Sequence, residues 1–456
     1  MKLNDLMAIS PIDGRYCKQT LLLKEIFSEY AFLKFRVKVE INWLKKLSSI
    51  NELKELPLFD KKTTEILNEI YEKFNKEDAY QIKKIEKKIK HDTKAIEYFL
   101  KKKISKIKKL DSIIEFIHFS CTSEDINNLS YALMLKTFIK ISLLPNWEKI
   151  ISLLKKLSFS SKNQVMLSRT HGQPATPTTM GKEIANFIFR LNRQLNQIKK
   201  IEILGKMNGT VGNYNANLVA YPNIDWIKVS REFVNQLGIE WNPYTTQIEP
   251  HDYISELFSC ISRFNLILID LARDIWGYIS LGYFSQKKIL KEIGSSIMPY
   301  KINPINFENA EGNLGLSNAI MNFIGEKLPV SRWQRDLSDS TVLRNLGVAL
   351  GYSIVSYTSI QTGIQKIKIN KKVVEKDLNN HWEILTEAMQ TILRRYGIKN
   401  SYEKLKKEIE KNKINSKNII YIIEKLPIPE KEKNKLKTLT PNKYVGLSIE
   451  LNDRIF

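Results

Sequence analysis

The sequence predicts a nearly all-α protein, and three observations lead to that prediction. Apolar residues recur at helical spacing over most of the 456 residues. Segments with the period-two alternation of strands are scarce. Polar stretches rich in Gly and Pro separate the periodic segments, and such stretches end helices. We therefore expect several helices of about 20 to 30 residues that pack into an elongated central bundle.

Three domains are expected along the chain, because 456 residues exceed what one ordinary core holds. Residues 1–111 are expected to form an N-terminal helical domain and residues 112–365 the central bundle. Residues 366–456 are expected to form a C-terminal domain of shorter helices, since prolines interrupt that segment.

Two apolar stripes are the clearest signs of bundle helices. The first takes steps of four and three through Leu257, Ile261, Phe264, Leu268, Leu271, Ile275 and Tyr278. The second runs through Ile184, Phe187, Leu191, Leu195 and Ile198. A third candidate helix belongs to SDSTVLRNLGVALGYSIVSY, where Ser340 is placed to cap the helix start. Stripes of this kind need other helices packed against them.

The net charge of +23 at neutral pH raises the question of nucleic-acid binding. Arg supplies only 14 of the 72 basic residues, and the Lys residues are spread among Ile and Asn in helical segments. This distribution is typical of solvated helix faces. We therefore expect no nucleic-acid partner, although a basic RNA-binding helical protein stays open as an alternative.

The chain is expected to be cytoplasmic and to use neither metal nor cofactor. Its N-terminus, MKLNDLMAIS, lacks the features of a signal peptide, and no apolar run approaches the roughly 18 residues of a membrane span. Cys17, Cys121 and Cys260 are scattered, so we interpret them as free thiols in a reducing compartment. The five histidines lack metal-ligand spacing, and no GxxxxGK[ST] or strand-borne GxGxxG segment occurs.

Polar segments between the apolar stripes carry the candidate chemistry. In GSSIMPYKINP, residues 294–304, Gly and Pro prevent regular structure, while Lys301 and Asn303 supply a cation and an amide. Backbone N–H groups together with such side chains hold anions. In SRTHGQPATP, residues 168–177, His171 stands in a Gly/Pro loop among hydrogen-bonding groups, where an imidazole exchanges a proton near neutral pH. A plain surface histidine is the alternative interpretation.

Two further segments suit anion binding. FSCTSEDINNLS, residues 119–130, is typical of a helix start, and both capping and carboxylate binding stay open for Thr122 and Ser123. RWQRDLSDSTVLRN, residues 332–345, contains three arginines, and guanidinium groups bind phosphate and carboxylate in a bidentate manner.

The remaining histidines carry less weight. We interpret His118 and His381 as structural residues. His251, in QIEPHDY, stays open between a structural and a functional interpretation.

Several of these segments resemble one enzyme superfamily. GSSIMPYKINP resembles the signature loop shared by fumarase, aspartase, argininosuccinate lyase and adenylosuccinate lyase. Segments along the whole chain resemble those of the bacterial adenylosuccinate lyases. They are SPIDGRY, HDTKAIEYFL, FIHFSCTSEDINN, SRTHGQPATPTTMGKE, VGNYNA, WNPYTTQIEPHD and LPVSRWQRDLSDSTVLRNLG.

The resemblance implies a fold and a reaction. It implies three α-helical domains, a homotetramer with a helical core, and active sites assembled from loops of three subunits. It also implies the release of fumarate by β-elimination from adenylosuccinate, giving AMP, and from succinylaminoimidazole carboxamide ribotide. Another fumarate-releasing lyase, such as argininosuccinate lyase or fumarase, stays open as an alternative.

Matching positions imply residue roles. Ser295 is expected to be the general base that removes the Cβ proton, and His171 the general acid that protonates the departing nitrogen. The residues implied to hold the succinyl portion are Thr122, Ser123, Gln247, Ser296, Lys301 and Asn303, with His91 and Asp92 supporting the reacting end. Those implied to position the nucleotide and its phosphate are Arg15, Tyr16, Arg335, Ser340 and Arg344, with Asn309 as a further contact.

Two residues depart from the family pattern. Lys90 stands where bacterial relatives commonly have Asn, and Tyr300 stands where they commonly have His. Lys90 is kept as a candidate substrate-binding residue that either attracts phosphate or reflects the Lys-rich composition. Tyr300 lies outside the proton-transfer pair, so it bears on its loop more than on the reaction.

Overall fold

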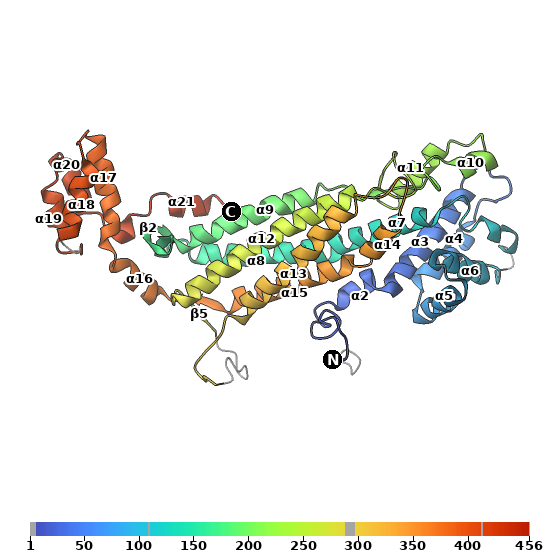
Figure 1. Ribbon diagram of the computed structural model, residues 1–456, viewed down its shortest axis with the longest axis horizontal. Coiled ribbons are helices and arrows are strands. Elements are labelled where there is room, and N and C mark those ends of the chain that lie inside the picture. Colours follow the sequence, from blue (N-terminus) through green and yellow to red (C-terminus); the bar gives the residue numbers. More distant parts are fainter. Residues whose placement is uncertain (1–5, 108–109, 288–296, 412–413, 456) are drawn as a thin grey trace. The chain divides into compact units, whose positions relative to one another are not determined.

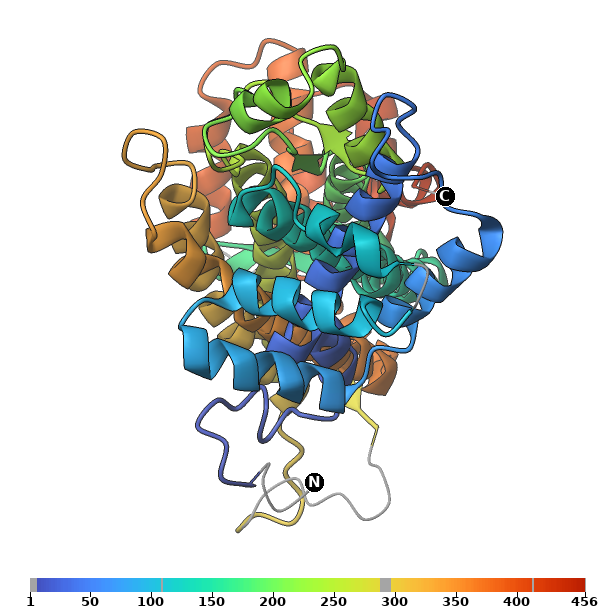
Figure 2. The same cartoon turned by 90° about the vertical axis from the view of Figure 1, so that its right-hand side faces the viewer.

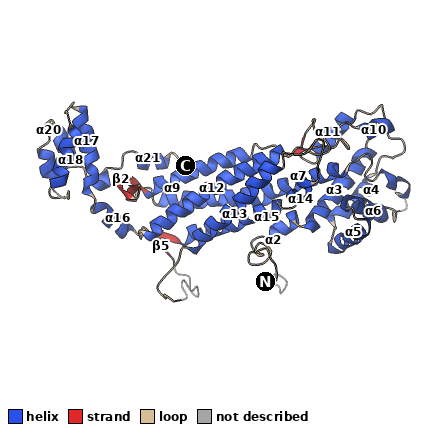
Figure 3. Ribbon diagram, viewed as in Figure 1, coloured by secondary structure: helices blue, strands red, loops and turns tan. Residues whose placement is uncertain are grey.

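The structure of the chain is a computed structural model that describes residues 6–107, 110–287, 297–411 and 414–455. Within these ranges most residues are helical and the strands are short (Figure 3), which confirms the all-α prediction. The chain divides into two compact units. The first unit consists of residues 1–147, 194–266 and 312–358, and the second of residues 148–193, 267–311 and 359–456. The three predicted domains and their boundaries stay a prediction.

The helices are labelled in chain order in Figure 1. Up to residue 200 they are α2 (Leu21–Phe27), α3 (Glu29–Ser48), α4 (Lys61–Glu72), α5 (Lys76–Ile89), α6 (Asp92–Ile104), η1 (Asp111–Phe116), α7 (Ser123–Phe138), η2 (Ile139–Leu143), α8 (Leu144–Ser160) and α9 (Met180–Ile198). Then follow α10 (Asn215–Ala220), α11 (Trp226–Gln236), α12 (Asp252–Ser280), α13 (Ile305–Lys327), α14 (Ser338–Leu343) and α15 (Leu346–Lys366). The last are α16 (Lys371–Asn379), η3 (Trp382–Leu385), α17 (Thr386–Arg395), α18 (Ser401–Lys411), α19 (Ile419–Glu424), α20 (Glu430–Lys437), η4 (Pro441–Lys443) and α21 (Ser448–Asp453).

The strands form two-stranded sheets. The antiparallel pairs are β1 (Val165–Thr170) with β2 (Gln173–Thr179) and β5 (Phe284–Gln286) with β6 (Ile367–Ile369), and the parallel pair is β3 (Leu204–Gly205) with β4 (Glu240–Trp241).

Both predicted apolar stripes are confirmed. The first lies on α12, where its members from Leu257 to Ile275 are buried and Tyr278 is half-buried. The second lies on α9, and all of its members are buried. The predicted cap at Ser340 is wrong. That residue lies inside α14, where the Asp336 carboxylate accepts from the backbone N–H of Ser338 at 2.7 Å and so supports the start of the helix.

The N-terminal helices of the first unit pack in pairs. α3 contacts α4 and α7, and α5 contacts α6; Figure 2 shows the last two side by side in blue. Local sequence explains where two of these helices begin. The Ser28 hydroxyl accepts from Ala31 N at the start of α3, and Asn75 with Asp78 forms a capping box at the start of α5.

The core of the first unit combines aromatic stacking with a buried polar network. The rings of Trp147 and Phe264 are parallel, with centroids 3.7 Å apart. Beside them Tyr357 Oη donates to Asn265 Oδ1 at 2.7 Å, and Asn265 Nδ2 donates to Asn318 Oδ1 at 2.9 Å. Because these hydrogen bonds join buried groups of α12, α13 and α15, they fix the register of the three helices.

The core of the second unit joins the β1–β2 hairpin to the C-terminal helices. Leu167 of β1 is buried in one cluster with Leu378 of α16, Leu385 of η3 and Met389 of α17. Fully burying each such side chain stabilises the fold by about 1.5–3 kcal/mol. The hairpin is therefore anchored by apolar contacts of β1.

The prediction of a Gly/Pro loop at residues 168–177 is wrong, because this segment forms most of the β1–β2 hairpin. Its turn consists of His171 and Gly172, whose φ angles of 53° and 76° are both positive. Two consecutive residues at positive φ form the turn that best joins two antiparallel strands. Prolines in β2 argue against a strand when only the sequence is considered. An edge strand nevertheless tolerates them.

Candidate functional site

The start of α7 is part of a buried electrostatic centre in the first unit. Thr122 caps the helix, and its backbone N–H donates to Asp125 Oδ2 at 2.8 Å. Asp125 also accepts from the backbone of Asn208 and Gly209. Lys206 Nζ lies 2.9 Å from Asp125 Oδ1, and both side chains are 0% exposed. The capping interpretation of this segment is confirmed, while Ser123 stays half-buried at the first helical position.

Arg335 and Gln247 lie beside this helix start. Arg335 Nη1 donates to Gln247 Oε1 at 3.0 Å, and Arg335 Nη2 donates to Glu124 Oε1 at 2.9 Å. Gln247 Nε2 in turn donates to the carbonyl of Thr210 at 3.1 Å. Burial raises the pKa of Glu124, whereas the positive charge of Arg335 opposes that shift. The guanidinium is thus already oriented by a carboxylate and an amide, and its side chain is 18% exposed.

A buried histidine lies close enough to Arg335 to be affected by its charge. His251 is 1% exposed and adopts a φ of 66°. Its Nδ1 lies 3.6 Å from Glu249 Oε2 and its Nε2 lies 4.0 Å from Asp339 Oδ2. Burial raises the pKa of Glu249 to about 7, and burial with the charge of Arg335 lowers the pKa of His251 to about 4. Between these two values both groups are uncharged, which explains how they share a buried site.

Asp92 joins two arginines at the start of α6. Its Oδ2 accepts from Arg36 Nη2 at 2.8 Å and from Arg344 Nη2 at 3.3 Å. Arg344 Nη1 also donates to Glu29 Oε2 at 2.9 Å. Burial opposes the ionisation of Asp92, but the two arginines and the Thr93 backbone N–H outweigh it and lower its pKa to about 2. Asp92 therefore stays ionised and holds Arg344 in place.

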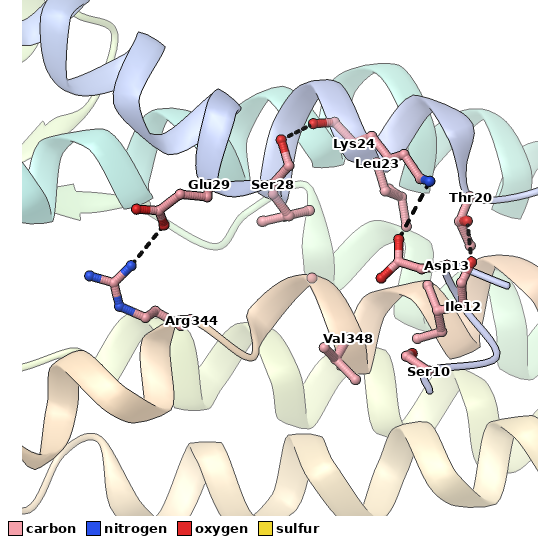
Figure 4. A pocket seen from close by; sticks show the side chains of 12 residues that line it. Ser10, Ile12, Asp13, Thr20, Leu23, Lys24, Ser28, Glu29, Arg344 and Val348 are labelled. Carbon is pink, nitrogen blue, oxygen red and sulfur yellow. Dashed lines mark hydrogen bonds and ion pairs between the residues drawn. The ribbon is translucent and has the colours of Figure 1, made fainter. Parts of the chain in front are cut away.

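A cavity of about 300 Å³ opens beside Arg344 (Figure 4). Figure 4 shows the Arg344–Glu29 pair on one side of it and the Lys24–Asp13 pair on the other. Both signs of charge therefore line this cavity.

The remaining candidates of the first unit lie near the surface. Arg15 and Tyr16 line a more open cavity of about 740 Å³, formed by the N-terminal turns. Lys90 ends α5 at a φ of 59° and is exposed, and His91 caps α6 by accepting from Lys94 N at 3.1 Å. Ser340 is half-buried, and its backbone N–H donates to Asp339 Oδ1 at 2.6 Å.

The second unit contains the remaining described candidates. His171 is exposed at the turn of the β1–β2 hairpin. Lys301 is exposed, Asn303 is half-buried, and Asn309 Oδ1 accepts from Ser359 Oγ at 2.8 Å. Ser295 and Ser296 lie outside the described residues. The role of Ser295 as the general base and the role of Ser296 in substrate binding therefore stay predictions.

Comparison with known proteins gives a family. A family model described as lyase matches residues 14–319, and one described as adenylosuccinate lyase C-terminal matches residues 331–445. The chain is 59% identical over 455 residues to an adenylosuccinate lyase from Buchnera aphidicola subsp. Schizaphis graminum, with 100% of both chains covered. It is 54% identical to an adenylosuccinate lyase from Escherichia coli strain K12, again with 100% of both chains covered.

The chain belongs to the adenylosuccinate lyase family.

Solved structures agree on the fold. A fumarate lyase from Mesorhizobium sp. BNC1 aligns with a TM-score of 0.75 at 14% identity, covering 95% of this chain and 97% of that chain. A 3-carboxy-cis,cis-muconate lactonizing enzyme from Pseudomonas putida aligns with a TM-score of 0.74 at 16% identity, covering 95% and 96%. At these identities the likeness shows a shared helical architecture alone.

Membership of the adenylosuccinate lyase family confirms the predicted carbon–nitrogen lyase. The C-terminal family match and the full-length identities support adenylosuccinate lyase over argininosuccinate lyase, fumarase and a basic RNA-binding protein. Among the described residues no group of three or more His, Cys, Asp or Glu side chains could hold a metal ion. None of the described helices is long and apolar enough to cross a membrane.

The structure brings some of the predicted residues into contact. Within the first unit, Gln247 contacts Arg335, and Asp92 contacts Arg344. Within the second unit, Asn309 contacts Ser359, a residue that the sequence does not suggest. The family assignment does not by itself test the roles of these residues, which stay predictions.

The sequence alone does not suggest the residues that orient the candidate site residues. Glu124 pairs with Arg335 across 211 positions, and Lys206 neutralises Asp125 across 81 positions, so neither pairing leaves a local pattern. Lys206 is also hidden by composition, since it is one of many lysines in the chain. The sequence offers one hint of these partners, which is the pair of acidic residues Glu124 and Asp125 shortly after Thr122. The same pair is also typical of an ordinary helix start.

Proposed function

We propose that the chain releases fumarate by β-elimination from adenylosuccinate, giving AMP, and from succinylaminoimidazole carboxamide ribotide, giving the corresponding carboxamide. The full-length identity to adenylosuccinate lyases carries this proposal. The paired arginines of the first unit support it, because both substrates carry a phosphate and two carboxylates that guanidinium groups can bind.

The proposed reaction uses two proton transfers. Ser295, as an alkoxide, removes the Cβ proton of the succinyl group, and the electron pair forms the new Cα–Cβ double bond. The Cα–N bond breaks, and the His171 imidazolium protonates the departing nitrogen. Lys301 stabilises the serine alkoxide and the negative charge that develops on the neighbouring carboxylate.

The other candidates have binding roles in this proposal. Thr122, Ser123, Gln247, Ser296, Lys301 and Asn303 hold the succinyl portion, and His91 and Asp92 support the reacting end. Arg15, Tyr16, Arg335, Ser340 and Arg344 position the nucleotide and its phosphate. Lys90 attracts the phosphate, and Asn309 is a further contact.

The assembly is proposed to be a cytoplasmic homotetramer in which loops of three subunits form each active site. Three long helices carry exposed aromatic side chains that are available for contacts between subunits, namely Phe189 on α9, Trp276 on α12 and Phe323 on α13. This arrangement also explains why candidates that share a reaction need not contact one another within one chain.

The direct test is an absorbance assay of the purified chain with both succinylated nucleotides. Turnover of argininosuccinate or malate instead of these nucleotides would reject the proposal. His171→Asn tests the acid, because Asn keeps the positive φ of the turn while it removes the imidazole. We expect kcat to fall about 10²- to 10⁴-fold with an unchanged unfolding midpoint.

Mixing two inactive variants tests the shared sites. His171→Asn and Lys301→Met are each expected to lack activity as pure proteins. If different chains contribute these residues to one site, unfolding and refolding the two variants together restores partial turnover. Sedimentation measures the assembly in the same samples. No recovery in a mixed tetramer would contradict the shared arrangement.

A further inference from the structure

The hairpin that carries His171 depends on support from outside its own strands. A two-stranded hairpin is marginally stable by itself. Pro174 and Pro177 remove two N–H donors from β2, and the strand register shifts at a bulge between Leu167 and Ser168. His171 is itself at a positive φ, which is unfavourable for a residue with a Cβ atom. The position of the imidazole is therefore set by what holds the strands.

Helix α16 holds β1 close to the turn. Arg169 lies two residues before His171, and its Nη2 donates to Asp377 Oδ2 at 2.7 Å. The two side chains are 25% and 24% exposed, so the pair is partly shielded from water. A charge-assisted hydrogen bond of this kind is about twice as strong as a neutral one.

Asp377 is in turn held by a buried tyrosine. Tyr283 Oη donates to Asp377 Oδ2 at 2.5 Å, and the tyrosine is 1% exposed. Burial first, and then the carboxylate, raises the pKa of Tyr283, so the hydroxyl keeps its proton. The Tyr283 carbonyl accepts from the backbone N–H of Asn370 at 2.8 Å, and Asn370 directly precedes α16. Asp377 thus has a fixed position from which it holds Arg169.

A second contact holds β2 farther from the turn. Thr176 Oγ1 donates to Glu387 Oε2 at 2.6 Å, and the same carboxylate oxygen accepts from Tyr444 Oη at 3.0 Å. Thr176 lies five residues from His171, whereas Arg169 lies two residues from it. The Asp377 contact is therefore the one placed to control the tip of the hairpin.

We propose that Asp377 is a positioning residue for the reaction, which acts through Arg169 on the hairpin and so places the His171 imidazole. This inference rests on the proposed role of His171 as the general acid. Asp377 contacts no reacting atom in this assignment. Tyr283 serves it by fixing its carboxylate, and His381 Nε2 approaches its other oxygen at 3.7 Å.

The test is Asp377→Asn, which keeps the volume of the side chain and removes its charge. We expect kcat to fall about tenfold while KM changes less than about twofold, because a small misplacement of a proton donor slows the chemical step more than binding. Hydrogen exchange of the peptide spanning residues 165–179 is expected to become faster. Glu375→Gln is the matched control, because it removes the same charge from an exposed position on the same helix.

Two further variants keep the inference testable if Asp377→Asn fails to fold. Tyr283→Phe removes one hydroxyl and is expected to speed exchange of the same peptide and to lower kcat by a smaller factor. Glu387→Gln is expected to affect kcat least, since its contact lies farther from the turn.

Exchange and kcat indistinguishable from those of Glu375→Gln in both Asp377→Asn and Tyr283→Phe would overturn the inference. If exchange of the hairpin rises but His171→Asn keeps full turnover, the assignment of the acid fails instead. Hydrogen exchange does not depend on activity, so these two failures are distinguishable.

Discussion

The two units present their candidate residues in opposite ways. In the first unit, Arg335 and Arg344 are already paired with Glu124 and Asp92, and the two arginine side chains are 18% and 41% exposed. In the second unit, His171 is exposed at a hairpin turn and Lys301 is exposed as well. These two arginines are thus held by carboxylates of their own unit. The group proposed to transfer a proton is presented outward.

This difference has a physical reason. An arginine that binds an anion gains from being oriented in advance, because less ordering is then required when substrate arrives. A proton donor must reach an atom of the substrate, and in the proposed tetramer that substrate is held by other chains. The position of the His171 imidazole therefore depends on how rigidly its hairpin is held. The Arg169–Asp377 pair contributes to that rigidity.

The largest effect is expected at the buried pair of the first unit. Lys206→Met leaves the Asp125 carboxylate buried without its cation, so we expect the free energy of unfolding to fall by about 3–5 kcal/mol. Urea unfolding measures this change. Lys228→Met, at an exposed position of the same unit, should stay within about 0.5 kcal/mol. Similar values for the two variants would contradict the electrostatic role of Lys206.

Arg335→Lys sharpens the contrast between binding and chemistry. Lysine cannot donate to Gln247 and Glu124 together in the way the guanidinium does, so we expect KM to rise about 10- to 100-fold. Steady-state kinetics with adenylosuccinate measures this. Arg332→Lys is the control, because that side chain is 82% exposed. A fall in kcat with unchanged KM would assign Arg335 to the chemical step instead.

Acid stability tests the pairing of Asp92. Its folded-state pKa of about 2 lies below the ordinary value of 3.8, so the pairing stabilises the fold above pH 4 and is lost as the pH falls toward 2. We expect Asp92→Asn to cost about 1–2 kcal/mol at pH 7. The difference from the parent protein should shrink between pH 4 and pH 2. A constant difference in urea unfolding across that range would rule out the linkage.

The smallest effect is expected at the end of α5. Lys90 adopts a φ of 59°, where glycine has no steric penalty, so Lys90→Gly should raise the free energy of unfolding by about 0.5 kcal/mol. Lys73, which ends α4 at a φ of −90°, provides the control. Lys73→Gly should lower stability by a similar amount. Thermal unfolding at matched concentrations measures both, and equal signs for the two variants would refute the conformational explanation.

The sequence predicts the helices well where periodicity is long. The stripe from Leu257 to Tyr278 extends over most of α12, so packing and helical propensity agree. Around His171 the sequence predicts a loop instead of the hairpin, because prolines interrupt β2 and no local pattern indicates a turn at His171 and Gly172. The helix cap at Ser340 failed because the nearby Asp336 supports the helix start instead.

The candidate site was predicted mainly through resemblance, and its partners were not predicted. Arg335 and Gln247 were named from their motifs, and they contact each other. Two carboxylates approach the Arg335 guanidinium. Glu124 is far from Arg335 in the chain, and Asp339, four residues after it, looks like an ordinary helix residue. Pairings of this kind depend on tertiary structure, which a single sequence does not display.

The interleaving of the two units has a consequence for biosynthesis. Each unit is built from three separate stretches of chain, and the last stretch of the first unit ends at residue 358. Trp147 is therefore synthesised long before Phe264, which stacks on it, and Tyr357, which packs against Phe264. Apolar surface stays uncovered through most of translation, so premature termination before residue 358 leaves both units incomplete and prone to aggregation.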